Sequence, residues 1–318
     1  MVARLLRSAE TALRFSALTG GVSSDIWRVD APRGTVCAKR ALPRLKVADE
    51  WLAPTRRNAE EAKWLRLVAH LAPGQVPDVL AEDANEGVLL LTWLDPAEWR
   101  NWKAELLAGR VDVEVGAALG RLIGTVHAAT SNDPGVAPRF DNMDLFEALR
   151  VRPYFVTAAE RNPLAAKSLS AVCTQLRERR SALVHGDVSP KNVLVRDGKA
   201  PVLLDAECAT WGDPTFDIAF MLSHLMLKAI HRGTRARDYT ATARACWSTH
   251  VALAGALVHR PQVMTAALLL ARVDGKSPVE YLSSGEAARV RELAVRYLND
   301  PPDDVPQLLE DWEAAAAR

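Results

Sequence analysis

The sequence has little of what marks a secreted, membrane-bound or nucleic-acid-binding protein. Its 318 residues include four cysteines, Cys37, Cys173, Cys208 and Cys246, and none of them forms a CxxC pair. Such scattered cysteines favour reduced thiols over a disulfide framework or a zinc site. No run approaches the ~20 apolar residues that a membrane helix needs. Residues 1–15 have apolar side chains at helical spacing broken by charges, unlike a signal peptide. We therefore expect a cytoplasmic protein without a membrane segment.

An excess of charge of one sign is also missing, because 40 Lys and Arg residues face 39 Asp and Glu residues. A net charge of +1 gives no electrostatic reason to expect nucleic acid or a membrane surface as a partner. The chain is 49% hydrophobic and 25% charged. This length and composition suit a globular protein with two lobes and separate cores, acting as a monomer or homodimer.

The most informative stretch lies within residues 182–222. Two apolar, strand-like runs, residues 192–195 and 202–204, flank an Asp197-Gly198 pair. An Asp-Gly pair between apolar runs is a strong signal of a two-residue hairpin turn. The sequence therefore predicts an antiparallel hairpin whose turn is centred on this pair.

The open end of this hairpin gathers oxygen-bearing side chains. With Asp197 and Gly198 in the turn, Asn192 faces Leu203, and Asp205 lies two residues further along, roughly 7 Å away. Asp187 precedes the first strand. Two carboxylates and an amide can be ordinary surface polarity, but they also suit Mg²⁺, which prefers one or two carboxylates plus substrate phosphates.

The order of these residues is more specific than their types. His-Gly-Asp ending at Asp187, then Asn192 and Asp205, resembles the catalytic segment of the aminoglycoside phosphotransferase and choline kinase-like family, and the resemblance continues in residues 205–207 and 212–217. It implies an α+β, protein-kinase-like bilobal fold that uses ATP and Mg²⁺. By this resemblance Asp187 is the catalytic base, Asn192 and Asp205 hold the metal, and Asp217 braces the catalytic loop.

The same resemblance divides the chain into a small antiparallel-sheet lobe, residues 1–93, and a helical catalytic and acceptor-binding lobe, residues 94–318. It implies that Lys39, at the end of an apolar strand, bridges the α- and β-phosphates and pairs with a helix glutamate. Alternation along the strand puts Cys37 on the face of Lys39, so Cys37 should cover the adenine. Helical periodicity over residues 58–72 does not choose between Glu60 and Glu61, whereas the family's register favours Glu61.

Two further segments have an ordinary and a functional interpretation. Gly20, Gly21, Ser23 and Ser24 lie in a turn-rich segment that either simply reverses the chain or brings backbone N–H groups to the phosphates. The apolar run 88–93 is either a plain core strand or the strand that enters the hinge. In the second case the backbone from Leu91 to Trp93 pairs with adenine.

From residue 95 onward the pattern is helical, as in residues 115–129. His127 ends that helix and is expected to pack in the core. Residues 131–165 are rich in Pro, Asn and Asp and are expected to connect short helices. Residues 218–273 contain seven Lys or Arg residues and one acid, which is either a solvated basic face or part of an acceptor site. The acceptor contacts that we expect are Glu207 and Arg272.

The charge of this region bears on the substrate. A polycationic aminoglycoside needs a carboxylate-lined pocket, and Glu207 is the only unassigned acid near the metal in sequence. Residues 37–47 and 51–62 also resemble methylthioribose kinases, although residues 189–192 depart from that subfamily. We predict a kinase for a hydroxyl of a small sugar-like metabolite. The alternatives are an aminoglycoside phosphotransferase and a non-catalytic nucleotide-binding pseudokinase.

Overall fold

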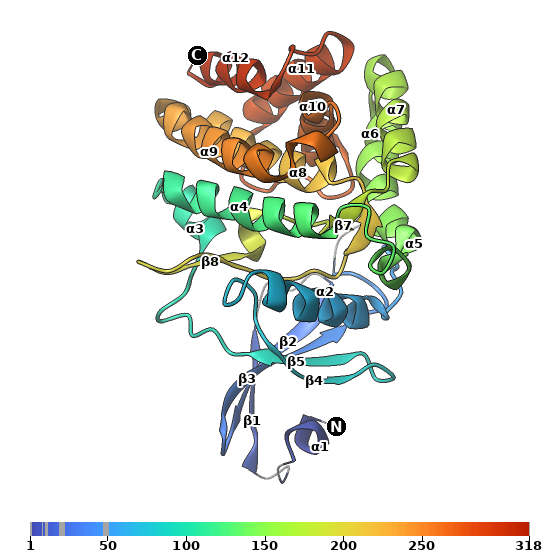
Figure 1. The fold of residues 1–318 in the computed structure, drawn as a ribbon. Helices are drawn as coiled ribbons and strands as arrows, with labels where there is room; N and C mark the ends of the chain where they lie inside the picture. Colours follow the sequence, from blue (N-terminus) through green and yellow to red (C-terminus); the bar gives the residue numbers. More distant parts are fainter. Residues whose placement is uncertain (1, 8, 10–11, 19–22, 47–50, 318) are drawn as a thin grey trace.

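The computed structural model describes residues 2–7, 9, 12–18, 23–46 and 51–317, and it has a sheet at one end and helices at the other (Figure 1). The sheet is antiparallel, with the strand order β1-β2-β3-β5-β4. Its strands are β1 (Arg14–Leu18), β2 (Ser24–Ala31), β3 (Gly34–Ala41), β4 (Val79–Asp83) and β5 (Val88–Thr92). Helix α1 (Val2–Leu6) lies beside this sheet, and α2 (Arg57–Leu71) lies between it and the helical part (Figure 1).

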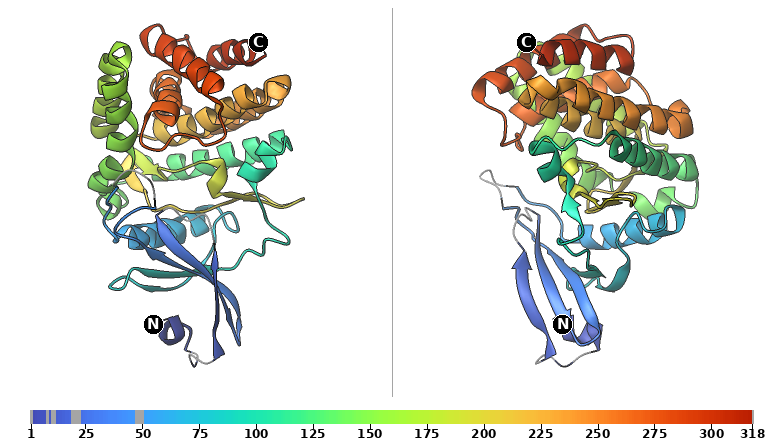
Figure 2. Two further views of the ribbon diagram at one scale, coloured as in Figure 1. Left: turned by 180° about the vertical axis from the view of Figure 1, so that it is seen from behind. Right: turned by 90° about the vertical axis from the view of Figure 1, so that its left-hand side faces the viewer.

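The rest of the chain is largely helical, and its later helices stack away from the sheet in both views of Figure 2. The longer elements are α3 (Trp102–Leu107), α4 (Val113–Thr130), α7 (Ala166–Glu178), α8 (Thr215–His231), α9 (Ala236–Ala254), α10 (Pro261–Asp274), α11 (Ser284–Asn299) and α12 (Val305–Ala316). An antiparallel sheet followed by a helical part confirms the predicted α+β class. The boundary between residues 93 and 94 stays a prediction.

Strand β3 shows why Lys39 can reach a functional site from an apolar strand. Val36 and Ala38 point into a small core that also contains Val29 and Leu90. Because side chains alternate along a strand, Lys39 points to the opposite face. Cys37 is its neighbour on that face and pairs in register with Leu91 of β5.

The sheet has its own small core on one face, but helix α2 belongs to the large core of the helical part. Helix α2 buries Trp64, Leu65 and Val68 in one hydrophobic cluster that continues through α4 and α8 of the helical part. The Trp64 ring also packs edge-on against the His185 ring, with 4.8 Å between centroids. Aromatic and aliphatic side chains surround much of α2, so this helix joins the sheet to the helices instead of packing on the sheet alone.

The predicted hairpin forms with a register shifted by one residue. Strand β8 (Val193–Val195) pairs Val193 with Leu203 of β9 (Val202–Leu203). The turn is where we expected it, since Lys199 N donates to Arg196 O. One additional residue is therefore accommodated between Lys199 and Val202, next to Pro201, which has no N–H for the ladder. As a result Asn192 lies opposite Leu204, and Leu204 N donates to Asn192 O at 2.8 Å.

Short strands and irregular helices complete the part that positions the site. Strand β6 (Arg100–Asn101) pairs with β8, and β7 (Ala182–Val184) pairs with β10 (Thr210–Gly212). Residues 131–165 do connect short helices, α5 (Met143–Phe146) and α6 (Thr157–Arg161), but a π-helical segment, η3 (Glu147–Val156), lies between them.

Among the described helices, none is long and apolar enough to cross a membrane alone. One strongly bent pair, residues 233–257 and 261–274, passes on length and composition together.

Candidate active site

A cleft of about 450 Å³ lies between the sheet and the helical part. It is lined by many of the residues singled out from the sequence, namely Ser23, Ser24, Cys37, Lys39, Glu61, Leu91, Trp93, Asn192 and Asp205. Gly20 and Gly21 lie outside the described residues. The structure thus brings together side chains at or next to β2, β3, α2, β5 and the hairpin, and the most distant of them, Ser23 and Asp205, lie 182 residues apart in the sequence.

Lys39 lies in the cleft between two carboxylates. Its Nζ is 2.6 Å from Glu61 Oε2 and also contacts Asp205 Oδ1. Burial alone would lower the pKa of Lys39, but Asp205 and Glu61 outweigh it and raise the pKa well above its ordinary value. Lys39 therefore remains an ammonium. Glu60 instead accepts from Asn142 and pairs with Lys63, so the structure resolves the alternative between the two glutamates in favour of Glu61.

Asp187 lies behind the cleft and is only 3% exposed. Its Oδ2 is 3.0 Å from Lys191 Nζ and 3.1 Å from Arg150 Nη2. Burial acts to raise the pKa of Asp187, but Lys191 and Arg150 together lower it below its ordinary value. The carboxylate is therefore ionised at neutral pH. Lys191 lines the cleft and connects Asp187 to it.

Asp217 of α8 holds the backbone of the loop that contains Asp187. Its carboxylate accepts from His185 N at 2.7 Å and from Gly186 N at 2.8 Å. Gly186 has a φ of +78°, and a Cβ at this position would lie 2.7 Å from Cys208 O, so only glycine fits. His127 is fully buried, 3.3 Å from Asp217 and 3.0 Å from His250. It is packed in the core, as we expected.

The residues present fit a nucleotide with a divalent cation. Asn192 donates from Nδ2 to Asp187 O at 3.0 Å, which leaves its Oδ1 available as a metal ligand. Asp205, which has a φ of +68°, lines the same cleft as Asn192, and its side chain is 24% exposed. Two such oxygens leave the remaining positions of Mg²⁺ to phosphates and water. Ser24 Oγ is buried at the cleft without a partner among the described residues, as a phosphate contact requires.

The two side chains expected to contact the acceptor do not line this cleft. Glu207 is buried and its Oε2 accepts from Arg57 Nε at 3.0 Å, so its charge is already neutralised. Arg272 lies on α10, where Nη1 donates to Tyr154 Oη at 3.2 Å and to Ser277 Oγ at 3.1 Å.

Sequence reasoning missed three cations that contact the predicted residues. Lys191 could have been found, because it follows Asp187 by four residues within a single loop. Arg150 comes from the segment assigned to connectors, and its Nε also donates to Gly186 O at 2.6 Å. Arg57 follows another arginine at the start of α2, and no local pattern distinguishes the buried one from the exposed one.

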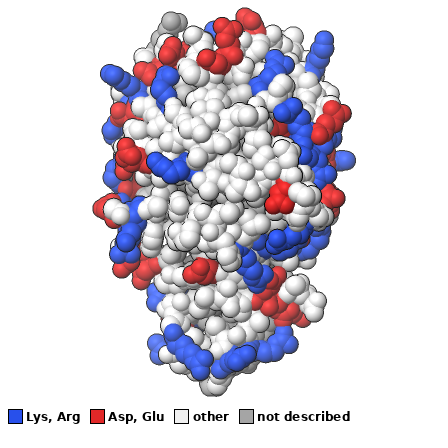
Figure 3. Space-filling model, viewed as in Figure 1, with Lys and Arg blue, Asp and Glu red and all other residues white. Residues whose placement is uncertain are grey.

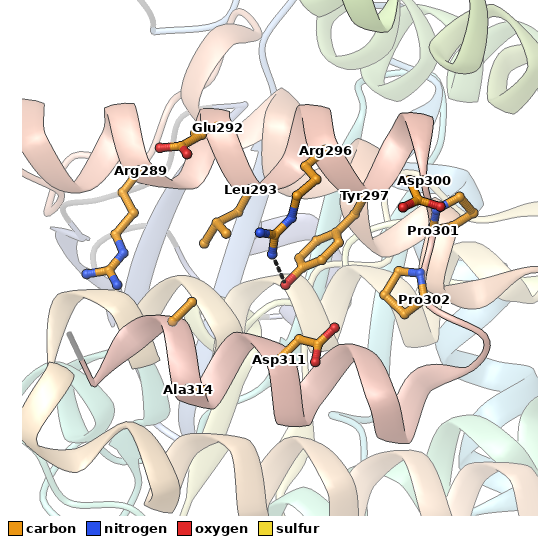
Figure 4. Close-up of a pocket in the computed structure, with 11 residues that line it drawn as sticks. Arg289, Glu292, Leu293, Arg296, Tyr297, Asp300, Pro301, Pro302, Asp311 and Ala314 are labelled. Carbon is orange, nitrogen blue, oxygen red and sulfur yellow. Dashed lines mark hydrogen bonds between the residues drawn. The ribbon is translucent and has the colours of Figure 1, made fainter.

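A second hollow, of about 700 Å³, lies between α11 and α12, far along the chain from the catalytic loop (Figure 4). It is lined by residues of both signs, including Arg289, Glu292 and Asp311. Arg296 turns towards Tyr297 and donates to its hydroxyl at 3.0 Å. We assign it no role.

The sheet, the helical part and the Lys39–Glu61 pair facing Asp205 define a protein of the kinase-like class. Residues 14–250 match the model of the phosphotransferase enzyme family. The chain therefore belongs to this family, which confirms the resemblance seen in the sequence.

Individual relatives are distant. A methylthioribose kinase from Bacillus cereus is 24% identical over 240 residues, which is 67% of this chain and 60% of the relative. The chain thus spans less than two thirds of the length of the curated relatives it matches. Two solved structures share the fold: an ethanolamine kinase from Plasmodium vivax (TM-score 0.51, 10% identity, 96% of this chain and 81% of that one) and a spectinomycin phosphotransferase solved with ADP and spectinomycin (0.50, 11%, 96% and 93%).

Proposed function

We propose that this protein is an ATP- and Mg²⁺-dependent kinase that transfers the γ-phosphate to a hydroxyl of a neutral or acidic sugar-like metabolite. The observation that carries the proposal is the cleft in which Lys39, Asn192 and Asp205 converge next to the ionised Asp187. Phosphoryl transfer requires mainly positioning and electrostatic stabilisation, and this arrangement offers both.

Each residue has a role that follows from its contacts. Lys39 binds phosphate oxygens, held in place by Glu61. Asn192 and Asp205 supply oxygens to Mg²⁺, which neutralises phosphate charge when bound. Asp187 orients the acceptor hydroxyl and takes its proton. Lys191 contacts Asp187 and lines the cleft, so it lies where charge develops during transfer.

The adenine pocket is proposed on the other side of Lys39. Cys37 and Leu91 pair in register and both line the cleft, which provides an apolar cover for the base. Trp93 continues the same wall, and the carbon-rich surface there contrasts with the charged end near Asp205. The apolar end suits the base of a nucleoside triphosphate, and the charged end suits its phosphates.

A polycationic acceptor finds little compensation in this structure. Glu207 is already paired with Arg57, and the acid nearest to Arg272 in the chain, Asp274, pairs with Arg291 at 2.6 Å. Like charges brought together cost several kcal/mol. We therefore place the aminoglycoside alternative second.

The proposed function is tested by measuring ATP turnover with Mg²⁺ against a panel of sugars, sugar acids, sugar phosphates, nucleosides and aminoglycosides, with ³¹P NMR to identify the product. Acceptor-dependent turnover on sugar-like alcohols that is lost in Asp187→Asn supports the proposal. Absence of ATP hydrolysis and transfer across the panel would leave the pseudokinase. Aminoglycoside tolerance in a sensitive bacterium that disappears with Asp187→Asn would support the antibiotic alternative.

A further inference from the structure

Two cations of the helical part have no carboxylate partner among the described residues. Lys228 of α8 is 1% exposed, and its Nζ reaches only His224 O and Tyr281 Oη, both at 3.5 Å. Arg272 of α10 contacts hydroxyl groups through Nη1, and its Nε is buried without a partner. Within the described part of the chain, neither cation has a carboxylate within 4 Å. We call Lys228 and Arg272 the α8–α10 cation pair.

One aromatic layer connects this pair to the proposed base. The centroid of the Tyr154 ring lies 5.7 Å from the Arg272 guanidinium and 5.5 Å from the Arg150 guanidinium. Arg150 in turn contacts Asp187 at 3.1 Å. Arg272 is therefore linked to Asp187 through Tyr154 and Arg150, and Lys228 is close enough to Arg272 for the arginine charge to lower its pKa.

In the free protein, the positive charges of the α8–α10 cation pair are in an unfavourable environment. Burial lowers the pKa of Lys228 to about 7, and the charges of Lys103 and Arg272 add to this effect, while Glu280 opposes it. Glu280 is itself paired with Lys103. Burial and the neighbouring cations, Arg272 first, lower the pKa of His224 well below its usual value, so that ring is neutral. Unpaired buried charge is costly unless a counter-charge arrives.

The other basic residues of this region are accounted for differently. Arg232 and Arg235 donate to the carbonyls of Leu107 and Gly109, and Arg244 lies 3.8 Å from Glu310. On the face in Figure 3 both signs of charge are interspersed. Lys228 is buried and Arg272 is half-buried, so the seven basic residues of the stretch do not all lie on one solvated face. Among the basic residues of this stretch that the structure describes, only Lys228 is buried, and Arg272 is half-buried with its Nε enclosed.

We propose that Lys228 and Arg272 bind an anionic group, a carboxylate or a phosphate, on the same molecule whose hydroxyl Asp187 deprotonates. Arginine offers a planar fork and lysine a compact charge, and both form short hydrogen bonds to such oxygens. The proposal rests on the proposed function, which it narrows from neutral or acidic acceptors to acidic ones. A lysine that is merely neutral and hydrogen-bonded to Tyr281 would bind no anion.

The first experiment compares initial rates on matched sugars, sugar acids and sugar phosphates of three to six carbons. Wild type should prefer an acidic series, and the preferred series distinguishes carboxylate from phosphate. Lys228→Met should lower kcat/KM for the preferred anion roughly 10- to 100-fold through KM, and leave the slow rate on the neutral analogue unchanged. Arg244→Met, an exposed arginine on α9, is the control and should resemble wild type. In wild type, KM for the anion should rise as the pH rises above about 7, because Lys228 loses its proton.

The second experiment does not depend on turnover. With ADP and Mg²⁺ present, inorganic sulfate at a chloride-matched ionic strength should raise the melting temperature of wild type and Arg244→Met more than that of Lys228→Met or Arg272→Gln, because a ligand stabilises the state that binds it. Equal sulfate effects in all four proteins overturn the inference, as does a neutral acceptor used as well as its acidic analogue. A wild type that transfers phosphate to no alcohol but shows the Lys228-dependent sulfate effect refutes the proposed function and retains the anion site.

Discussion

Replacing Glu207 with alanine should destabilise the protein strongly, although Glu207 does not line the cleft. Arg57 is fully buried, and all its polar atoms have acceptors. Nε donates to Glu207, Nη1 to the Ala53 and Pro54 carbonyls, and Nη2 to the Ser23 and Leu42 carbonyls. Glu207 supplies the only negative charge among these groups, so its removal leaves a buried guanidinium without compensation.

The magnitude follows from this geometry. Breaking a buried ion pair by removing one partner costs about 3–5 kcal/mol, and we expect Glu207→Ala to lie in this range. Glu207→Gln keeps a hydrogen bond to Nε and should cost less, about 1–3 kcal/mol. Replacing both residues, as Arg57→Met with Glu207→Leu, should cost less than the sum of the single changes, because no unpaired charge remains.

The assay is urea unfolding of wild type, Arg57→Met, Glu207→Leu and the double variant as a double-mutant cycle. Glu207→Ala and Glu207→Gln are measured beside them, and KM for ATP is a second measurement. Because Arg57 holds the Ser23 carbonyl at the edge of the cleft, KM for ATP should rise in Arg57→Met. Glu98→Ala is the matched control, since Glu98 forms an exposed pair with Arg196 and should lose under about 1 kcal/mol. A Glu207→Ala protein within about 1 kcal/mol of wild type would show that Arg57 does not depend on this carboxylate.

Four other substitutions test the remaining assignments. Asp187→Asn should lower kcat about 10²- to 10⁴-fold with KM for ATP unchanged, and full turnover would remove Asp187 from the mechanism. Raising Mg²⁺ should partly restore Asn192→Ala but not Lys39→Ala, whereas equal restoration would contradict the separate roles for metal and phosphate. Lys228→Met should stabilise the free protein, because the folded state lowers the pKa of Lys228 from 10.5 to about 7. The cost of this lysine is full below pH 7 and fades as the pH approaches 10.5, so urea unfolding at pH 6.5 and 9.5 should show the larger gain at pH 6.5.

The parts of the site that the sequence predicted are those fixed by short-range geometry. Alternation along one strand places Cys37 and Lys39 on one face, and a few residues of loop separate Asp187 from Asn192. These relations do not depend on how the rest of the chain folds. The predicted hairpin register was wrong by one residue, because an additional residue is accommodated before Pro201. The turn residues Asp197 and Gly198 alone do not reveal this irregularity.

The parts that the sequence could not predict depend on contacts between distant elements. Arg150 reaches Asp187 from a π-helical segment whose composition resembles a loop, and Pro153 within it argues against a helix by propensity. The basic residues after Asp217 looked like one group because they are close in the chain. Helix α8 ends at His231, so Lys228 is buried near Tyr281 within the helix, whereas Arg232 follows its end and donates to a carbonyl of α3.

The segment from Asp205 to Glu207 shows how little separates a catalytic from a structural carboxylate. Asp205, at a φ of +68°, contacts Lys39, whereas Glu207 contacts Arg57, and Ala206 between them is fully buried. Both cations belong to the sheet-bearing part of the chain and both acids to the helical part. Mg²⁺ that binds Asp205 would compete with Lys39 for the same carboxylate, while the Arg57–Glu207 pair stays intact. If the proposed Mg²⁺ site forms, the Arg57–Glu207 pair keeps the two parts of the chain in contact while Asp205 exchanges Lys39 for the metal.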